Sequence, residues 1–240
     1  MKIAGIIPAR FASTRFPGKP LVNIDGKTMI HRVYEQASKA TSLSEVIVAT
    51  DDERIFKEVD RFGGKVLMTA KHHQNGTERC AEVAEQLDAD VIINIQGDEP
   101  FIQPEQINLL ASIFTAGTEI PDIATLIKEH ALDEELRNHA RIKVVTNKYL
   151  DALYFSRSII PFFRDTTKAD AATYYKHIGI YAFRKAVLTD LVKLPPSRLE
   201  LAESLEQLRW LENGYRIKCA ITTFESVSVD TPEDLVGLSF

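Results

Sequence analysis

The sequence contains little cysteine and has no excess of positive charge. Its 240 residues include two cysteines, Cys80 and Cys219, too few for a disulfide framework or a four-thiolate zinc site. The 29 Lys and Arg residues stand against 34 Asp and Glu residues, which gives a formal charge of -5. Because nucleic-acid-binding domains are normally basic, we expect no nucleic-acid partner.

Long apolar runs are also absent. A membrane-spanning helix needs about 18 or more consecutive apolar residues, and no stretch of the sequence comes near that length. The run from Met1 to Pro8 is short and is soon followed by Arg10, unlike a secretory signal. We therefore expect a cytoplasmic protein without a membrane partner, and we interpret Cys80 and Cys219 as small buried side chains.

Short apolar runs alternate with segments of helical spacing over the first half of the chain. Helical segments follow Asp52, Gly76 and Pro104. Runs typical of buried strands occupy residues 3–7, 46–49, 66–68, 91–95 and 123–127. The alternation predicts an α/β fold with a mostly parallel sheet, helices on both faces and a ligand site at the carboxyl ends of the strands.

The alternation stops at about residue 128 and returns after residue 183. Strand-like runs at 143–146, 152–155 and 177–183 surround a polar loop at 165–173. Beyond them we expect helices over 184–193 and 199–212, a strand over 216–222 and a short helix opened by Thr231-Pro232. We interpret residues 1–240 as one domain that carries a mixed or antiparallel insertion at about 128–183.

The first strand is followed by a loop rich in cations. Arg10, Arg15 and Lys19 fall within ten residues between Pro8 and Pro20. Cations and backbone amides at the carboxyl end of a strand suit a polyphosphate. The string is neither a Walker A loop nor a dinucleotide fingerprint. From the residues alone, a solvated basic loop is an equal alternative.

Two aspartates follow other predicted strands. Asp98 ends the apolar run 91–95 in the string Gln96-Gly97-Asp98-Glu99, and Asp230 precedes Thr231-Pro232. A carboxylate at a strand end is a suitable ligand for Mg2+, which commonly takes only one or two protein carboxylates. Each aspartate also fits a turn or helix cap, and for Asp230 alone the cap is favoured.

Several strings of residues, in order along nearly the whole chain, together resemble one enzyme family. They are residues 6–21, 48–51, 73–79, 94–100, 154–157, 177–181, 205–209 and 229–235. These strings are similar to those of the 3-deoxy-manno-octulosonate cytidylyltransferases. The resemblance implies a Rossmann-like nucleotidyltransferase fold, Mg2+ dependence and a homodimer. It also implies transfer of CMP from CTP to the anomeric hydroxyl of 3-deoxy-D-manno-octulosonate (Kdo), which activates Kdo for lipopolysaccharide biosynthesis.

The resemblance also implies roles for individual residues. CTP would contact Pro8, Ala9, Arg10, Ser13, Arg15, Lys19, His73, Gln74, Gly76 and Thr77. Catalysis would depend on Arg10, Lys19, Asp98 and Asp230, with the two aspartates as the metal ligands. The sugar would contact Arg79, Gln96, Arg157, His177, Tyr181, Glu206 and Gln207, and the insertion would serve sugar binding and dimerisation.

Without the resemblance, these residues have simpler interpretations. Residues 73–77 would be a plain helix N-terminus, His177 and Tyr181 would be core-edge residues on one face of a strand, and Glu206 would lie on a solvated helix face. Two other functions also stay open at this point. One is a cytidylyltransferase acting on 8-amino-Kdo or a sialic acid, and the other is a CTP-binding regulator without catalytic activity.

Overall fold

The computed structural model describes residues 1–12, 16–116, 119–165, 173–225, 228–229 and 231–235. Within these residues nine strands form one sheet, whose main path has the order β11-β7-β10-β6-β1-β4-β5. The strands of this path are β1 (Ile3–Ala9), β4 (Glu45–Thr50), β5 (Val66–Met68), β6 (Val91–Asn94), β7 (Ile123–His130), β10 (Tyr174–Arg184) and β11 (Ile217–Ile221). Along the path β10 runs antiparallel to both its neighbours, whereas the other pairs are parallel.

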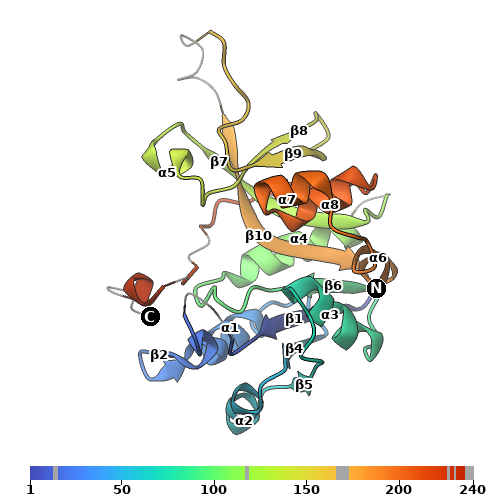
Figure 1. Cartoon of the computed structure of the whole chain (residues 1–240). Helices are drawn as coiled ribbons and strands as arrows, with labels where there is room; N and C mark the ends of the chain where they lie inside the picture. Colours follow the sequence, from blue (N-terminus) through green and yellow to red (C-terminus); the bar gives the residue numbers. More distant parts are fainter. Residues whose placement is uncertain (13–15, 117–118, 166–172, 226–227, 230, 236–240) are drawn as a thin grey trace.

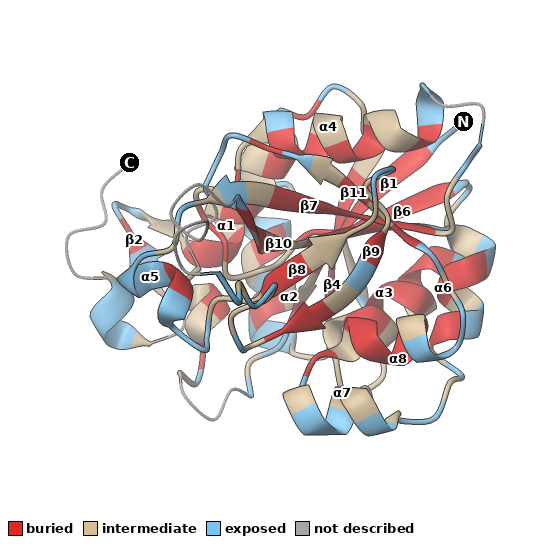
Figure 2. Cartoon of the chain, turned by 90° about the horizontal axis from the view of Figure 1, so that it is seen from above, coloured by how far each residue is buried: buried red, intermediate tan, exposed pale blue. Residues whose placement is uncertain are grey.

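Helices cover both faces of the sheet, as the alternation predicts. One face carries α1 (Met29–Ala37), α2 (Glu53–Arg61) and α4 (Pro104–Thr115). The other carries α3 (Gly76–Glu85), α6 (Lys185–Leu191) and α8 (Glu206–Glu212), and α7 (Arg198–Glu203) packs beside α8. Figure 2 shows the buried strands between α4 on one side and α3, α6 and α8 on the other.

The apolar runs become buried strands because both faces of each strand are covered. Along β1, Ile3 and Ile7 pack with α1, α2 and α4, whereas Ala4 and Ile6 pack with α3, α6 and α8. The two cysteines lie in the second of these cores, and burial raises the pKa of the Cys219 thiol to about 12. The interpretation of both cysteines as small buried side chains is confirmed.

A three-strand annex forms one end of the molecule. Its three strands are β8 (Lys143–Thr146), β9 (Ala152–Ser156) and the first part of β10. β8 lies between the other two and pairs antiparallel with both. The short helix α5 (Glu134–Arg137) lies at the same end, away from α2, β4 and β5 (Figure 1). The antiparallel strands expected in this region are therefore present, while the expected loop at 165–173 falls largely outside the described residues.

The N-terminal and C-terminal parts of the chain meet beside α1. One small apolar cluster contains Ile24, Met29, Val229 and Leu235. Ile24 comes from the hairpin of β2 (Asn23–Ile24) and β3 (Lys27–Thr28), and Leu235 comes from the 3-10 helix η3 (Pro232–Leu235). The short helix opened by Pro232 is thus confirmed as a 3-10 turn.

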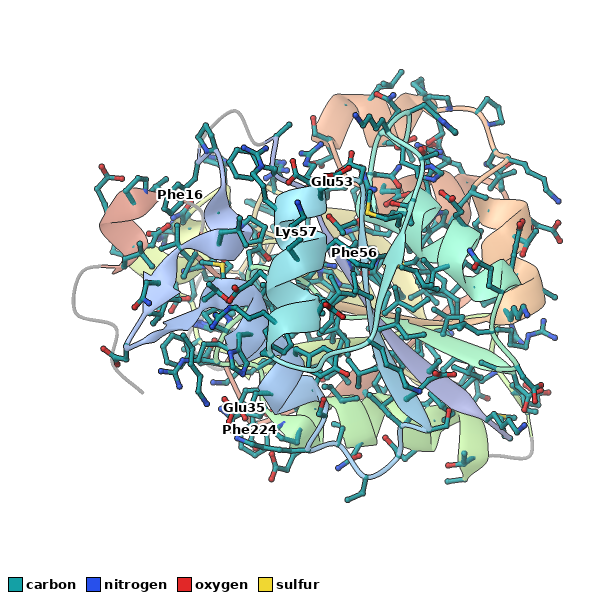
Figure 3. The ribbon with its side chains drawn as sticks, turned by 90° about the horizontal axis from the view of Figure 1, so that it is seen from below. Phe16, Glu35, Glu53, Phe56, Lys57 and Phe224 are labelled. Atoms are coloured by element: carbon teal, nitrogen blue, oxygen red, sulfur yellow. The ribbon has the colours of Figure 1, made fainter. Side chains whose placement is uncertain are left out.

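On the outer side of the molecule, Figure 3 shows Glu53 and Lys57 on α2, where their side chains approach to 3.8 Å.

Two helices differ from the sequence prediction. Residues 29–37 form α1, although the sequence analysis assigns no element there; Met29, Ile30, Val33 and Ala37 have the spacing of its buried face. The single helix expected over 199–212 is wrong, because the chain breaks between α7 and α8 at Ser204, whose φ is 51°. A serine in the left-handed region is uncommon, so no simple sequence signal marks the break.

Candidate active site

Two glycines allow three segments to approach each other at the end of β1. A Cβ on Gly97, just after β6, would lie 2.7 Å from the carbonyl oxygen of Pro8. A Cβ on Gly76, the first residue of α3, would lie 3.0 Å from Pro8 Cγ. Position 97 therefore requires glycine for the segments to meet at Pro8, and a side chain at position 76 would be tightly packed against the Pro8 ring.

A cleft of about 320 Å³ opens where these segments meet. It lies at the carboxyl ends of β1 and β6, as expected for a mostly parallel α/β sheet. Its walls come from the loop after β1, the turn before α3 and the turn after β6. The lining residues are Pro8, Ala9, Arg10, Lys19, Pro20, His73, Gln74, Asn75, Gly76, Arg79, Gln96, Gly97 and Asp98.

Lys19 and Asp98 form an ion pair on one wall of the cleft. Lys19 Nζ lies 2.7 Å from Asp98 Oδ2 and donates a second hydrogen bond of 2.8 Å to the carbonyl of Val229. The N–H of Val229 in turn donates to the Asp98 carbonyl at 2.9 Å. The short helix η1 (Lys19–Leu21) therefore holds its cation between the turn after β6 and the C-terminal segment.

The turn before α3 is fixed by reciprocal hydrogen bonds. The Asn75 side chain caps the helix by accepting from Glu78 N at 2.8 Å, and the Glu78 carboxylate accepts from Gln74 N at 2.8 Å. The imidazole of His73 contacts the Glu82 carboxylate. These bonds order the turn so that His73, Gln74 and Gly76 face the cleft.

Arg79 lies in the cleft wall but is almost completely buried. Its side chain is 4% exposed, and its guanidinium donates to Asp51 Oδ2 at 3.1 Å and to the Thr69 hydroxyl. These contacts join α3 to the ends of β4 and β5. The positive charge of Arg79 is thus already paired with a carboxylate at the edge of the cleft.

Thr77 and Glu206 connect the cleft to α8. The Thr77 hydroxyl donates a hydrogen bond of 2.8 Å to Glu206 Oε2. Burial raises the pKa of the Glu206 carboxyl to about 7, although the bond from Thr77 acts in the opposite direction. The simpler interpretation of Glu206 as a solvated helix residue is wrong. Gln207, the next residue, is buried as well.

His177 and Tyr181 lie on one face of β10, as the sequence predicts. Their ring centroids are 5.3 Å apart, and His177 also packs edge-on against Phe155. Burial lowers the pKa of His177 to about 3. Thr125 Oγ1 lies 3.0 Å from His177 Nε2 and donates to the carbonyl of Ile180 at 2.8 Å. Since a threonine hydroxyl has one proton, this arrangement places a proton on Nε2 of a neutral imidazole.

Arg157 lies at the end of β9, next to α7 and α8. Its guanidinium donates to the backbone carbonyls of Glu203 at 2.6 Å, His139 at 3.1 Å and Ser204 at 3.3 Å. It does not line the cleft. Ser204, which supplies one of these carbonyls, lies two residues before Glu206 and three before Gln207 in the sequence.

The structure brings most of the expected residues into two adjoining regions. The cleft contains Pro8, Ala9, Arg10, Lys19, His73, Gln74, Gly76, Arg79, Gln96 and Asp98. Thr77 leads from it to the second region, around Tyr181, Glu206 and Gln207, while His177 lines a smaller neighbouring cavity with Glu99 and Lys176. Ser13, Arg15 and Asp230 lie outside the described residues.

Asn94 and Gly97 also belong to this part of the molecule, although neither was singled out from the sequence. Asn94 ends β6 opposite Tyr181 on β10. It is 4% exposed, and neither its Oδ1 nor the Tyr181 hydroxyl has a hydrogen-bond partner among the described residues. An amide at the last position of an otherwise apolar strand is the signal that could have identified Asn94. Gly97 could be recognised only from its distance to Pro8.

Comparison with known proteins agrees with this geometry. Residues 4–217 match the model of the cytidylyltransferase family. The chain is 56% identical to the 3-deoxy-manno-octulosonate cytidylyltransferase of Bacteroides thetaiotaomicron, over 98% of this chain and 96% of that protein. A relative of the same name from Geobacter metallireducens is 50% identical, over 98% of this chain and 95% of that protein.

Solved structures give the same result. A CMP:2-keto-3-deoxy-manno-octonic acid synthetase complexed with CTP superposes with a TM-score of 0.92 and 44% identity, covering 98% of this chain and 95% of that one. A 4-diphosphocytidyl-2C-methyl-D-erythritol synthase from Anaerococcus prevotii shares only 14% identity at a TM-score of 0.62, which shows the fold alone. The α/β nucleotidyltransferase fold predicted from the sequence is confirmed.

Proposed function

The chain belongs to the 3-deoxy-manno-octulosonate cytidylyltransferase family, and from this premise we propose that the family reaction takes place in the cleft at the ends of β1 and β6. The reaction transfers CMP from CTP to Kdo and releases pyrophosphate. Charge accumulates on the phosphate oxygens as the bond to pyrophosphate breaks. The observation that carries the assignment to this cleft is that Arg10, Lys19 and Asp98 all line it.

The cations of the loop after β1 would bind the triphosphate. Arg10 is exposed at the mouth of the cleft, and a guanidinium can donate to two phosphate oxygens at once. Lys19 is held between Asp98 and the Val229 carbonyl, and its side chain is 14% exposed. A phosphate oxygen would compete with Asp98 for this ammonium. Arg15 and Ser13 stay predictions of the same kind.

Asp98 and Asp230 are our proposed ligands for Mg2+. Asp98 fits this role because its carboxylate is partly exposed in the cleft and already contacts a cation, the Lys19 ammonium. Asp230 follows Val229, which is hydrogen-bonded to the Asp98 backbone. Two carboxylates are enough for Mg2+, which takes its other ligands from phosphates and water. When bound, Mg2+ would neutralise phosphate charge and lower the pKa of the attacking hydroxyl.

The sugar would lie between the cleft and α8. Thr77, Asn94, Tyr181 and Glu206 line this region with hydrogen-bonding groups, two of which lack a partner in the described residues. A polyol needs both donors and acceptors, which this set supplies. The carboxylate of Kdo would then face the cations at the cleft, and its anomeric hydroxyl would face the α-phosphate.

A homodimer and a cytoplasmic location are further proposals from the family likeness. The annex and the segment after β9 support a subunit contact there, because Leu153 on β9 is 59% exposed and Phe162 after β9 is 86% exposed. Sedimentation velocity would test the dimer, with Phe162→Glu expected to give the 27.0 kDa monomer. No helix among the described residues is long and apolar enough to cross a membrane. Cell fractionation would test the location.

Pyrophosphate release tests the proposed reaction. The purified protein would be given CTP and Mg2+ with Kdo, 8-amino-Kdo or a sialic acid in parallel. We expect the highest kcat/KM with Kdo and no release without a sugar acid. Tight CTP binding without release on any of the three acids would contradict the proposal and favour a regulator, whereas preference for 8-amino-Kdo would retain the mechanism and change the substrate.

A further inference from the structure

The break between α7 and α8 decides where Glu206 and Gln207 lie. Ser204 adopts φ 51° and ψ 50°, so the chain turns sharply after Glu203 and α8 begins two residues later at Glu206. A left-handed conformation costs a non-glycine residue about 1 kcal/mol or more. The Leu205 side chain is buried, but no side chain caps α8. Backbone N–H groups of Ser204 and Leu205 donate to the Glu200 carbonyl and close the turn locally, and contacts from elsewhere in the chain add to them.

Arg157 and Glu203 supply such contacts in both directions. The Arg157 guanidinium donates to the backbone carbonyls of Glu203, the last residue of α7, and of Ser204, the residue at the turn. Carbonyls at a helix C-terminus lack intrahelical donors, and a cation satisfies them well. In return, the Glu203 carboxylate accepts from Arg157 N at 2.9 Å and from the Ser156 hydroxyl at 2.6 Å. We call this reciprocal pair the Arg157–Glu203 clamp.

Lys143 fixes the clamp to the annex. Its side chain is fully buried, and its ammonium donates to the carbonyls of Arg157, Arg141 and Asn138, the last two at 2.6 and 3.3 Å. A buried ammonium needs three acceptors to be satisfied, and these three carbonyls provide them. The end of β9 therefore has little freedom to move relative to β8. Because the clamp joins the end of β9 to α7, it also fixes the position of α7 relative to these strands.

We propose that Arg157 is a positioning residue, which acts through Glu203 and the turn at Ser204 to place Glu206 and Gln207 against the sugar. The inference rests on the proposed function and deepens it. It assigns Arg157 a role different from direct contact with the sugar carboxylate, because its guanidinium donors are directed to backbone carbonyls. Since Glu206 accepts from Thr77 only while α8 holds its present position, loss of the clamp would displace the sugar-binding side chains and leave the cleft in place.

A double-mutant cycle tests the positioning role. Arg157→Gln removes the guanidinium bonds to the Glu203 and Ser204 carbonyls, whereas Glu203→Gln replaces one of the two carboxylate acceptors for Arg157 N and the Ser156 hydroxyl by an amide donor. We expect each to raise the KM for Kdo by about tenfold or more, with the KM for CTP changed less than about twofold. The double variant should be about as impaired as the worse single variant, because the two different sets of bonds hold the same turn and the loss of either releases it. If Arg157 contacts the sugar directly, Glu203→Gln should leave the KM for Kdo unchanged, or the two effects should add; either result would overturn the proposal.

Ser204→Gly should restore Kdo binding to a variant without the clamp if Arg157 positions α8, but not if Arg157 contacts the sugar directly. Glycine adopts the left-handed conformation without strain, so the turn should hold with less help from the clamp. We expect Ser204→Gly in the Arg157→Gln background to recover at least about half of the lost affinity for Kdo, because the turn is restored. No recovery in a variant that melts at the parental temperature would count against the proposal. Arg157→Lys gives a milder variant if Arg157→Gln does not fold.

The controls separate this inference from the proposed reaction. Wild-type protein that releases no pyrophosphate with Kdo would overturn the proposed function itself. Active wild-type protein whose KM for Kdo is unaffected by Glu203→Gln would overturn only the positioning role. Glu85→Gln, at an exposed position on α3, is the matched control for loss of one carboxylate and should change neither KM.

Discussion

Lys19 and Asp98, 79 positions apart in the sequence, form a 2.7 Å ion pair in the wall of the cleft. The pair joins the cation-rich loop after β1 to the turn after β6, and the Val229 carbonyl accepts a second hydrogen bond from the ammonium. The opposite charges of the two side chains neutralise each other. A triphosphate would bring negative charge to Lys19 and a requirement for a metal ligand to Asp98, so we expect the pair to change partners when substrate binds.

The first prediction concerns Asp98→Asn. The amide keeps the size of the side chain but removes the negative charge that would hold Mg2+ and balance Lys19. We expect kcat to fall by about 100-fold or more, with the KM for CTP changed much less, because charge neutralisation matters most in the transition state. Pyrophosphate release measured over a Mg2+ titration would check this. An unchanged kcat at saturating Mg2+ would exclude Asp98 as a metal ligand.

The second prediction concerns Gly97→Ala. Its Cβ would lie 2.7 Å from the Pro8 carbonyl oxygen, which is a backbone atom and not the end of a flexible side chain that could move aside. We expect a loss of about 1–3 kcal/mol in the free energy of unfolding, as for other overpacked sites, and a raised KM for CTP because the cleft walls separate.

A matched control distinguishes the cleft from general instability. Gly214 has a left-handed φ of 84°, unlike Gly97, and a Cβ there has nothing within 4 Å. Gly214→Ala should therefore cost about 1 kcal/mol of backbone strain and leave the KM for CTP unchanged. Equal effects of the two variants on KM would show that Gly97 has no specific role in forming the cleft.

The location of the cleft could be predicted from the sequence because it depends on local signals. Arg10 and Lys19 follow one apolar run, Asp98 follows another, and parallel strands bring their carboxyl ends to one edge. Glu206 could be assigned to the sugar-binding region only from the family likeness, since a glutamate on a helix is ordinarily solvated. Its environment depends on a distant segment, because the hydrogen bond that it accepts comes from Thr77 on α3, 129 positions away.

Other features could not be predicted because they depend on contacts between distant segments. The break at Ser204 is stabilised by Arg157, 47 positions earlier, and nothing in residues 199–212 themselves marks it. The need for glycine at position 97 likewise arises from the approach of Pro8. By contrast, α1 was predictable, because Met29, Ile30, Val33 and Ala37 already show the spacing of a buried helix face.

The third prediction concerns the effect of Glu206 on stability as pH changes. Burial raises its pKa from 4.5 in the unfolded chain to about 7 in the fold. Between these values the unfolded chain has released the proton and the folded chain retains it. The free energy of unfolding therefore falls as pH rises, by up to about 1.4 kcal/mol per pH unit. In Glu206→Gln this contribution should vanish, whereas Glu85→Gln should behave as wild type. Urea midpoints measured from pH 4.5 to 7.5 would check this.

The fourth prediction concerns His177, whose contribution has the opposite sign. Its pKa falls from 6.5 in the unfolded chain to about 3 in the fold, so between these values the unfolded chain binds the extra proton. Stability from this group is lost as pH falls below about 6.5 and is complete above it. From pH 4.5 to 6.5 the contributions of His177 and Glu206 therefore oppose each other in wild-type protein.

A variant that lacks one of the two titrating groups should show the pH dependence of the other group alone. The urea midpoint of Glu206→Gln should rise with pH between 4.5 and 6.5, whereas that of His177→Gln should fall over the same interval, because each variant retains one of two opposing titrations. The double variant should show neither slope. The two residues lie on different elements and share no hydrogen bond that would couple their protonation. If the urea midpoints of both single variants changed with pH in the same direction, at least one of the two residues, His177 or Glu206, would be solvated in the fold. Such a result would remove that residue from the buried sugar-binding region.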